Sequence, residues 1–243
     1  MRRPASTYAS SFSFGPGGPL STALKALIGA NVVMFVAQFV LPALTELFGL
    51  HPAWVLHRFW LWQTATYMFL HGGVFHIQFN MLALWMFGTE LERIWGTRYF
   101  LKFYFVTGIG AGALTVLFSL LTGQLQQANI IGASGAIYGL LLAYAMYFPD
   151  RPILLIVFPV PAKIAVMILG AIALFSSLSD AGGVANATHL GGLLVAYLFL
   201  KGARMHPISE VKYRYLKWKI NRVRKKFDVY SGGRSNDYDR RVH

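Results

Sequence analysis

The sequence contains no cysteine. This absence excludes disulfide bonds, thiol nucleophiles and cysteine-ligated metal sites. Cysteine usage is also the feature that separates proteins of oxidising compartments from those of reducing ones. The compartment therefore cannot be read from redox chemistry.

Charged residues are scarce as well. Only 13% of the 243 residues are Asp, Glu, Lys or Arg, whereas 56% are hydrophobic and the mean hydropathy is +0.50. Soluble domains carry about a quarter charged residues. The composition therefore predicts an integral membrane protein.

The net charge of +13 is concentrated near one end of the chain. Thirteen of the 22 Lys and Arg residues lie from Lys201 onward, directly after the last apolar segment. This placement is typical of a cytoplasmic tail against anionic membrane lipid, so lipid is the expected partner and nucleic acid is not. Residues 1–19 are rich in Ser, Gly and Pro and have no apolar core, so no cleavable signal peptide is predicted.

Apolar segments predict an all-α, polytopic bundle of six transmembrane helices. Their expected ranges are 24–48, 74–94, 99–121, 132–148, 162–179 and 188–200. The segment 49–73 is rich in Trp and His and is expected to be a structured loop, half-submerged at the membrane surface. The short stretch 153–161 contains two prolines and is expected to form a surface or re-entrant hairpin.

These segments divide the chain into three parts. We expect a disordered cytoplasmic tail at 1–23, a membrane domain at 24–203 and a basic cytoplasmic tail at 204–243 with an amphipathic helix at 207–227. The loops on one side of the bundle carry the Lys and Arg residues, whereas those on the other side carry only Arg58. The positive-inside rule then places both termini in the cytoplasm. Short tails and the absence of a presequence favour a bacterial inner membrane.

The chain is organised around a serine between glycines, in Gly132-Ala133-Ser134-Gly135, from which an apolar helix continues directly. If this helix ends at the interface near Pro149, its first turn lies below the outer surface of the membrane. A hydroxyl buried there costs a few kcal/mol unless it has a polar partner. His189, at the start of the sixth apolar segment, is the downstream side chain that can also accept a proton.

A serine and a histidine at one depth support acyl transfer. Ser134 would attack a carbonyl carbon, and His189 would take its proton and later deliver it to the leaving amine. The nearest acidic residue, Asp180, belongs to the loop 180–187 before the sixth helix, so a dyad is simpler than a triad. Tyr138, one turn after Ser134, is expected to pack against the imidazole.

Two further polar residues share that depth. His76 and Asn80 lie on one face of the second predicted helix, and together with backbone N–H groups at the start of the serine helix they would form an oxyanion hole. Small residues at four-residue spacing would let the fourth and sixth helices approach closely. These residues are Gly135, Gly139, Ala143, Gly192 and Ala196.

Three motifs together resemble the rhomboid family of intramembrane serine proteases. They are Gly132-Ala133-Ser134-Gly135, His76-x-x-x-Asn80 and His189-x-x-Gly192, within a similarity that covers about 24–200. The resemblance implies cleavage of single-pass membrane proteins in or near their transmembrane segments. It also implies that substrate enters between the second and fifth helices, and that no cofactor or metal takes part.

The resemblance also implies a role for each matched residue. Ser134 is the nucleophile, His189 the base, and His76 and Asn80 the oxyanion contacts, while His71 stabilises a loop. Gln63 departs from the pattern, because it follows Trp62 where many family members carry Arg. This difference touches no catalytic position but can alter the packing of the outer loop.

The same residues are compatible with several alternatives. Ser134 could be a small packing residue, and His76 or Asn80 a structural side chain. A zinc site from His71, His76 and His189 has no supporting carboxylate and no His-Glu-x-x-His motif. A catalytically inert relative that binds membrane clients would fit the same helices, although such relatives typically lack the serine or the histidine. A channel or transporter would need polar residues through the whole membrane depth.

Overall fold

The computed structural model describes residues 19–124, 127–155, 158–177 and 183–204. By its internal contacts the chain divides into two units, Met1–Lys201 and Gly202–His243, and the residues around the candidate site all lie in the first. The elements, in chain order, are α1 (Thr22–Val40), α2 (Ala43–Phe48), α3 (Pro52–Arg58), α4 (Gln63–Thr66), η1 (Tyr67–Phe69), α5 (Val74–Trp95), α6 (Thr97–Thr122), α7 (Ser134–Tyr147), β1 (Pro152–Leu155), β2 (Phe158–Pro161), α8 (Ala162–Ser177) and α9 (Gly183–Arg204).

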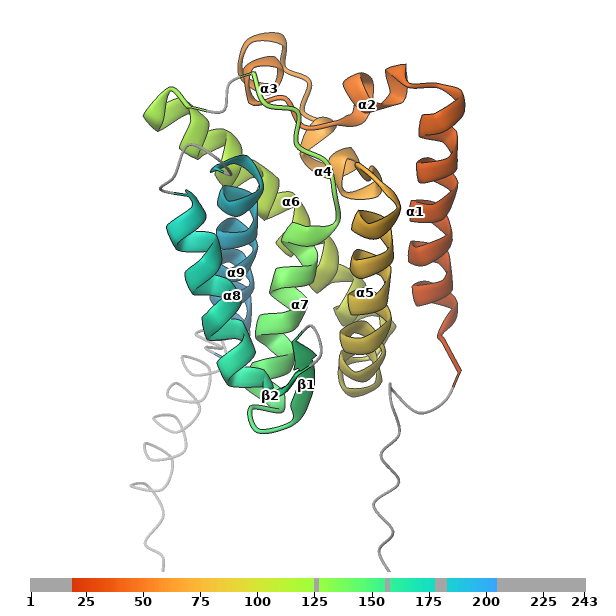
Figure 1. The fold of residues 1–243 in the computed structure, drawn as a ribbon, viewed down its shortest axis with the longest axis vertical. Helices are drawn as coiled ribbons and strands as arrows, with labels where there is room; N and C mark the ends of the chain where they lie inside the picture. The colour runs from red at the N-terminus through yellow and green to blue at the C-terminus, as the bar shows by residue number, and fades with distance from the viewer. Residues whose placement is uncertain (1–18, 125–126, 156–157, 178–182, 205–243) are drawn as a thin grey trace, which may run out of the picture. The chain divides into compact units, whose positions relative to one another are not determined.

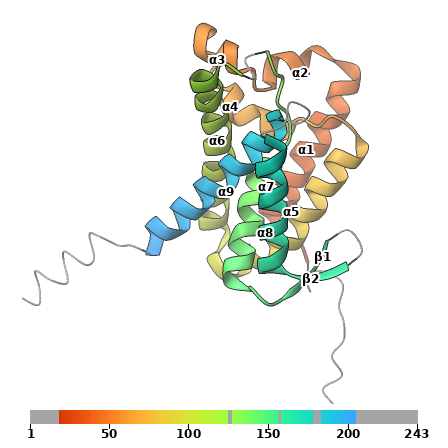
Figure 2. The ribbon, with the colours of Figure 1, turned by 60° about the vertical axis from the view of Figure 1, so that its left-hand side comes forward.

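Helix α7 lies at the centre of the described bundle. It packs against α5, α6 and α8, while α1 lies at the edge of the bundle beside α5 (Figure 1). The view in Figure 2 shows α9 running obliquely past α7 and α8. The short helices α2, α3 and α4 gather at one end of the bundle, and the β1–β2 hairpin lies at the other (Figure 1).

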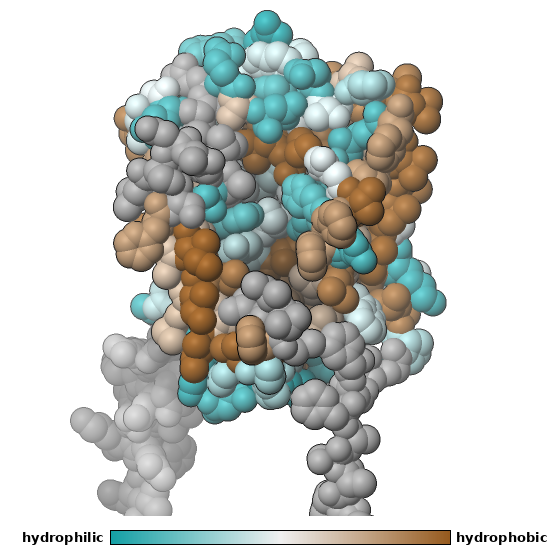
Figure 3. All heavy atoms as spheres, in the orientation of Figure 1, coloured by the Kyte–Doolittle hydropathy of each residue, from teal (hydrophilic) through white to brown (hydrophobic). Residues whose placement is uncertain are grey.

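Within the described ranges, two helices are both long and apolar enough to cross a membrane, namely α1 with 19 residues and α6 with 26. Helix α7 and the segment Ala162–Phe175 of α8 are apolar but shorter. Large apolar side chains are exposed along the outer helices, as the brown edge over α1 in Figure 3 shows. Phe39 of α1 and Phe175 of α8 are each 71% exposed. Such faces are suited to contact with an apolar medium rather than water.

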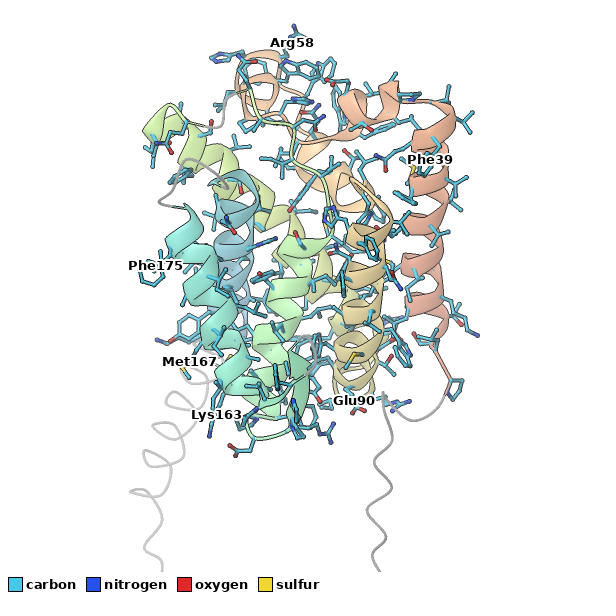
Figure 4. The ribbon with its side chains drawn as sticks, viewed as in Figure 1. Phe39, Arg58, Glu90, Lys163, Met167 and Phe175 are labelled. Carbon is cyan, nitrogen blue, oxygen red and sulfur yellow. The ribbon has the colours of Figure 1, made fainter. Side chains whose placement is uncertain are left out.

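The predicted hairpin at 153–161 is confirmed. Strands β1 and β2 pair antiparallel, with Leu155 opposite Phe158. The backbone N–H of Ala162 donates to the carbonyl of Arg151 at 3.0 Å, which closes the base of the hairpin. The Arg151 guanidinium also lies 3.5 Å from the Glu90 carboxylate at the end of α5. Figure 4 shows Glu90 and Lys163 at this end of the bundle and Arg58 at the opposite end.

The first predicted helix, 24–48, is wrong in its length. Helix α1 ends at Val40, and Leu41 has φ −130° and ψ 80°, outside the helical region. The cause is Pro42, because the ring of a proline disfavours the helical conformation of the residue before it. The chain resumes as the separate helix α2 at Ala43.

Two other predicted boundaries are also corrected. Helix α7 starts at Ser134 rather than at residue 132, and its 14 residues span about 21 Å. Helix α9 starts at Gly183, so 183–187 is helical and His189 lies in the second turn, not the first. Ala185 and Ala187 favour this extension, because alanine has the highest helix propensity.

The disordered tail predicted at 1–23 is too long, because α1 already begins at Thr22, with Ser21 as its N-cap. Residues 1–18 of that tail, Asp180 and the amphipathic helix predicted at 207–227 lie outside the described residues.

The segment 49–73 is structured, as predicted, and consists of α3, α4 and η1. A backbone bridge between Leu50 and Ile130 joins it to the chain just before α7, with N···O distances of 2.9 and 3.0 Å. Gln63 is completely buried within the segment. Its Oε1 accepts from the His51 N–H at 3.0 Å, and its Nε2 donates to the Glu46 carbonyl at 3.3 Å. Gln63, the residue at which this chain departs from the family pattern, therefore stabilises the loop by hydrogen bonds to its backbone and to the end of α2.

Candidate active site

The serine is presented by a turn that only glycine can form. Gly132 has φ +128°, a conformation that L side chains rarely adopt, and its N–H donates to the Tyr67 carbonyl at 2.9 Å. A Cβ placed on Gly132 would lie only 2.8 Å from Nε2 of His76. Two residues later α7 begins, so Ser134 is its first residue. The turn therefore leads directly into the helix that carries the hydroxyl.

The structure brings Ser134 and His189 together. The Ser134 Oγ lies 2.8 Å from the His189 Nε2, a hydrogen bond between residues 55 positions apart in the chain. The approach of α9 to α7 makes this contact possible, because Gly192 lies against the backbone of Gly135 with no room for a Cβ. Hydroxyl and imidazole are therefore in the relation that proton transfer requires.

The His189 ring is held by Tyr138. Their rings stack at 4.1 Å between centroids and 9° between planes. For Nε2 to accept the serine proton, the ring proton must be on Nδ1. Among the described residues Nδ1 has no hydrogen-bond partner. Within those ranges, orientation of the base thus comes from stacking and not from a carboxylate.

His76 is also brought to the site, and Asn80 lies one turn further along α5 with one amide proton bonded within the helix. The Nε2 of His76 and the Oγ of Ser134 lie 2.8 and 3.8 Å from one point, the Cβ position of Gly132. The Asn80 Nδ2 donates to the backbone carbonyl of His76 at 2.8 Å, one turn back in α5. The amide has a second N–H, but this hydrogen bond ties Asn80 to its own helix. Of this pair, His76 is thus the side chain that reaches the glycine turn before the serine.

His71 lies behind His76 and not beside the serine. It is only 2% exposed, and its ring packs edge-on against His76, with 5.1 Å between centroids and 70° between planes. In the described ranges no group of three His, Asp or Glu side chains is arranged to bind a metal ion.

A pair of threonines next to the base was not predicted from the sequence. The Thr115 hydroxyl of α6 donates to the Ala111 carbonyl at 2.9 Å, and the Thr188 hydroxyl lies 3.0 Å from it. Thr188 directly precedes His189 and is 2% exposed. The pair therefore connects α9 to α6 next to the imidazole of His189. In the sequence, the only indication of this pair is that both residues are polar and lie within apolar segments.

We expect Thr115→Val to weaken this tie without changing the side-chain shape. Interhelical hydrogen bonds in membrane bundles contribute about 0.6 kcal/mol on average, so the unfolding midpoint in detergent should fall by a small, measurable amount. Thr122→Val is the matched control, because Thr122 makes the same type of bond to its own helix, at the exposed end of α6. Equal midpoints for both variants would contradict the interhelical role.

Comparison with known proteins connects this geometry with a family. The model of the rhomboid domain matches residues 58–204, more than half of the chain. The chain belongs to the rhomboid family. The matched residues include the serine turn, His76, Asn80 and His189, and exclude α1.

Individual relatives agree with this assignment. Rhomboid protein 1, mitochondrial, of Saccharomyces cerevisiae is 38% identical over 138 residues, which cover 54% of this chain and 38% of that protein. Rhomboid protease GluP of Bacillus subtilis is 32% identical over 133 residues, 55% of this chain and 24% of the relative. RHOMBOID-like protein 2 of Arabidopsis thaliana is 27% identical over 176 residues, 72% and 52% of the two chains. The chain thus spans between about a quarter and a half of these relatives.

Membership of the family establishes the general class. Rhomboid proteins are helical membrane proteins, many of them serine proteases that act on membrane proteins, and relatives of this chain occur in mitochondria, plants and bacteria.

Proposed function

We propose that this rhomboid protein is an intramembrane serine endopeptidase that cleaves single-pass membrane proteins in or near their transmembrane segments. The observation that carries the proposal is the 2.8 Å contact between the Ser134 Oγ and the His189 Nε2, at the start of an apolar helix. A hydroxyl and an imidazole at this distance can act as the nucleophile and the general base of acyl transfer. Neither metal nor cofactor is required.

The proposed reaction has two halves. The Ser134 Oγ attacks the carbonyl carbon of the scissile peptide bond while its proton passes to the His189 Nε2. The tetrahedral intermediate collapses, the C–N bond breaks, and His189 returns the proton to the leaving amine. A water molecule then gives its proton to His189 and attacks the acyl-serine ester. Collapse releases the new carboxyl group and restores the Ser134 hydroxyl.

The negative charge on the intermediate needs donors that are in place beforehand. His76 supplies one from α5, because its Nε2 lies 2.8 Å from the Cβ position of Gly132, and the Ser134 Oγ lies 3.8 Å from the same point. The first N–H groups of α7 supply others, since the first turn of a helix leaves them without intrahelical partners. Asn80 contributes through its hold on the His76 backbone or through its second amide proton.

We propose six membrane spans, formed by α1, α5, α6, α7, α8 and α9. The end that carries Glu90, Arg151 and Lys163 is the cytoplasmic one, since basic residues mark that side. Both termini are then cytoplasmic, and the serine opens toward the outer face, where α2, α3 and α4 gather. Substrate enters between α5 and α8, whose exposed faces carry large apolar side chains such as Phe79 and Met167. A bacterial inner membrane is the proposed location.

Labelling by a mechanism-based probe tests the proposal directly. The purified full-length protein is incubated with a fluorophosphonate, and with a panel of single-span substrates whose products are sequenced. Covalent labelling of Ser134 together with cleavage in or near the spans is the expected result. A folded protein that neither labels nor cleaves would instead be an inert, client-binding member of the family.

His76→Ala should lower kcat, with little change in KM. Loss of one oxyanion donor costs up to about 10²–10³-fold in well-studied serine proteases. Asn80→Ala should cost less, because the structure places its amide on the His76 carbonyl. Turnover is measured on a single-span reporter. If both variants turn over like the unaltered protein, the oxyanion assignment is wrong.

A further inference from the structure

Gln38 of α1 clamps the backbone just before α5. Its Oε1 accepts from the His71 N–H at 3.0 Å, and its Nε2 donates to the His71 carbonyl at 3.3 Å. The same Nε2 donates to the Thr45 hydroxyl of α2 at 3.0 Å. A polar amide on a helix with an exposed apolar face is costly unless its groups are paired, and here both ends of the amide are used.

The clamped backbone in turn holds His76. The N–H of Gly72, the residue after His71, donates to the His76 Nδ1 at 3.3 Å. The His71 ring also packs edge-on against the His76 ring. The position and orientation of the His76 ring therefore depend on the segment His71–Gly72, and that segment is tied to α1 through Gln38.

This contact also selects the tautomer of His76. A neutral imidazole has one nitrogen that donates and one that accepts. Because Nδ1 accepts from Gly72, the ring proton lies on Nε2, the nitrogen that faces Gly132 in the turn before the serine. The opposite tautomer would present a lone pair to a developing oxyanion, which repels it.

We infer that Gln38 is a positioning residue that keeps the His76 Nε2–H aimed at the candidate oxyanion site, through the His71–Gly72 backbone. The inference rests on the proposed function for its catalytic meaning, and adds a residue outside the region 58–204 that the rhomboid-domain model matches. It gives α1 a part in the chemistry, although α1 supplies no group that touches the serine.

Gln38→Leu removes the clamp and keeps the size of the side chain. Gln38 lines a cavity of about 280 Å³ together with Phe35, His71 and Ile131, so a branched apolar side chain can be accommodated. Thr45→Val is the matched control, because it deletes the third hydrogen bond of the same amide and leaves both bonds to His71.

The test uses full-length protein with ¹⁵N-labelled histidine in detergent micelles, with the His76 signals assigned by their loss in His76→Gln. In the unaltered protein the His76 nitrogens should show the shifts of an Nε2–H tautomer. In Gln38→Leu we expect a mixture of tautomers, and a kcat lower by about 10-fold or more, with KM little changed. Thr45→Val should resemble the unaltered protein in both measurements.

Two outcomes would overturn the inference. One is an unchanged His76 spectrum in Gln38→Leu, and the other is an equal change in Thr45→Val, which would point to the general packing of α1 on α2. The protease proposal fails in a different way, through an unaltered protein that neither cleaves nor labels at Ser134. If such a protein still shifts its His76 signals in Gln38→Leu, the positioning role stands and the protease assignment does not.

Discussion

Ser134→Ala is expected to abolish cleavage of a single-span reporter and labelling by a fluorophosphonate, while the protein stays folded. Without the hydroxyl no acyl-enzyme can form, and without its proton acceptor the hydroxyl is a weak nucleophile, so His189→Ala should have a comparable effect. Single losses of this kind cost about 10⁶-fold in kcat in soluble serine proteases. Initial rates on the reporter and the unfolding midpoint in detergent are the measurements.

Ser119→Ala serves as the control for this pair. Ser119 is a fully buried serine of α6, and its hydroxyl has no partner among the described residues. Its removal should leave both the rate and the labelling as they are. Retained turnover in Ser134→Ala or in His189→Ala would rule out the dyad, whereas a lost rate in Ser119→Ala would mean that any buried hydroxyl deletion damages the bundle.

Gly192→Ala should both destabilise the bundle and remove activity. A Cβ at this position would overlap the Gly135 carbonyl oxygen and lie 2.9 Å from its carbon. Both are backbone atoms, so α7 and α9 must separate. Overpacking of this kind costs about 1–3 kcal/mol or more. A shift of about 1 Å between the Ser134 hydroxyl and the His189 imidazole can cost about 10²-fold in rate.

Gly202→Ala, near the end of the same helix, is the matched control. A Cβ there meets no atom of the described part of the chain within 4 Å, so the variant should keep full activity and unfold no more easily. Thermal unfolding and reporter cleavage are measured for both variants. Full activity in Gly192→Ala would mean that the close approach of α7 and α9 is not what brings hydroxyl and imidazole together.

Sequence periodicity located most helices but misplaced ends where local and tertiary effects compete. The end of α1 has a local cause, because Pro42 disfavours the helical conformation of Leu41. The predicted helix 24–48 runs through this proline and is therefore too long. The start of α9 at Gly183 was missed because the Gly and Asn residues of that segment favoured a loop in isolation. Alanine propensity and the packing of α9 on its neighbours outweigh that local preference.

For the site, sequence reasoning could identify residue types but not all of their contacts. Ser134, His189 and Tyr138 are predicted to share one location, and the structure places them in contact. Asn80 was expected to aim at the oxyanion, yet its amide bonds to its own helix, a choice that depends on rotamer and on neighbouring backbone. In the sequence, Gln38 is only a polar residue within an apolar segment, and its hydrogen bonds to His71 cannot be predicted from that.

The sequence by itself determined the class of the protein and the identity of its reactive groups, because apolar segment length and the glycine-serine, His-Asn and His-Gly motifs are local properties of the chain. The tertiary structure alone decided which nitrogen of His189 contacts the serine, which nitrogen of His76 faces Gly132, and which residues outside the motifs hold those rings. The physical reason is distance. Hydrogen bonds such as those from Gln38 to His71 and from Gly72 to His76 depend on positions fixed to within an ångström by packing between helices.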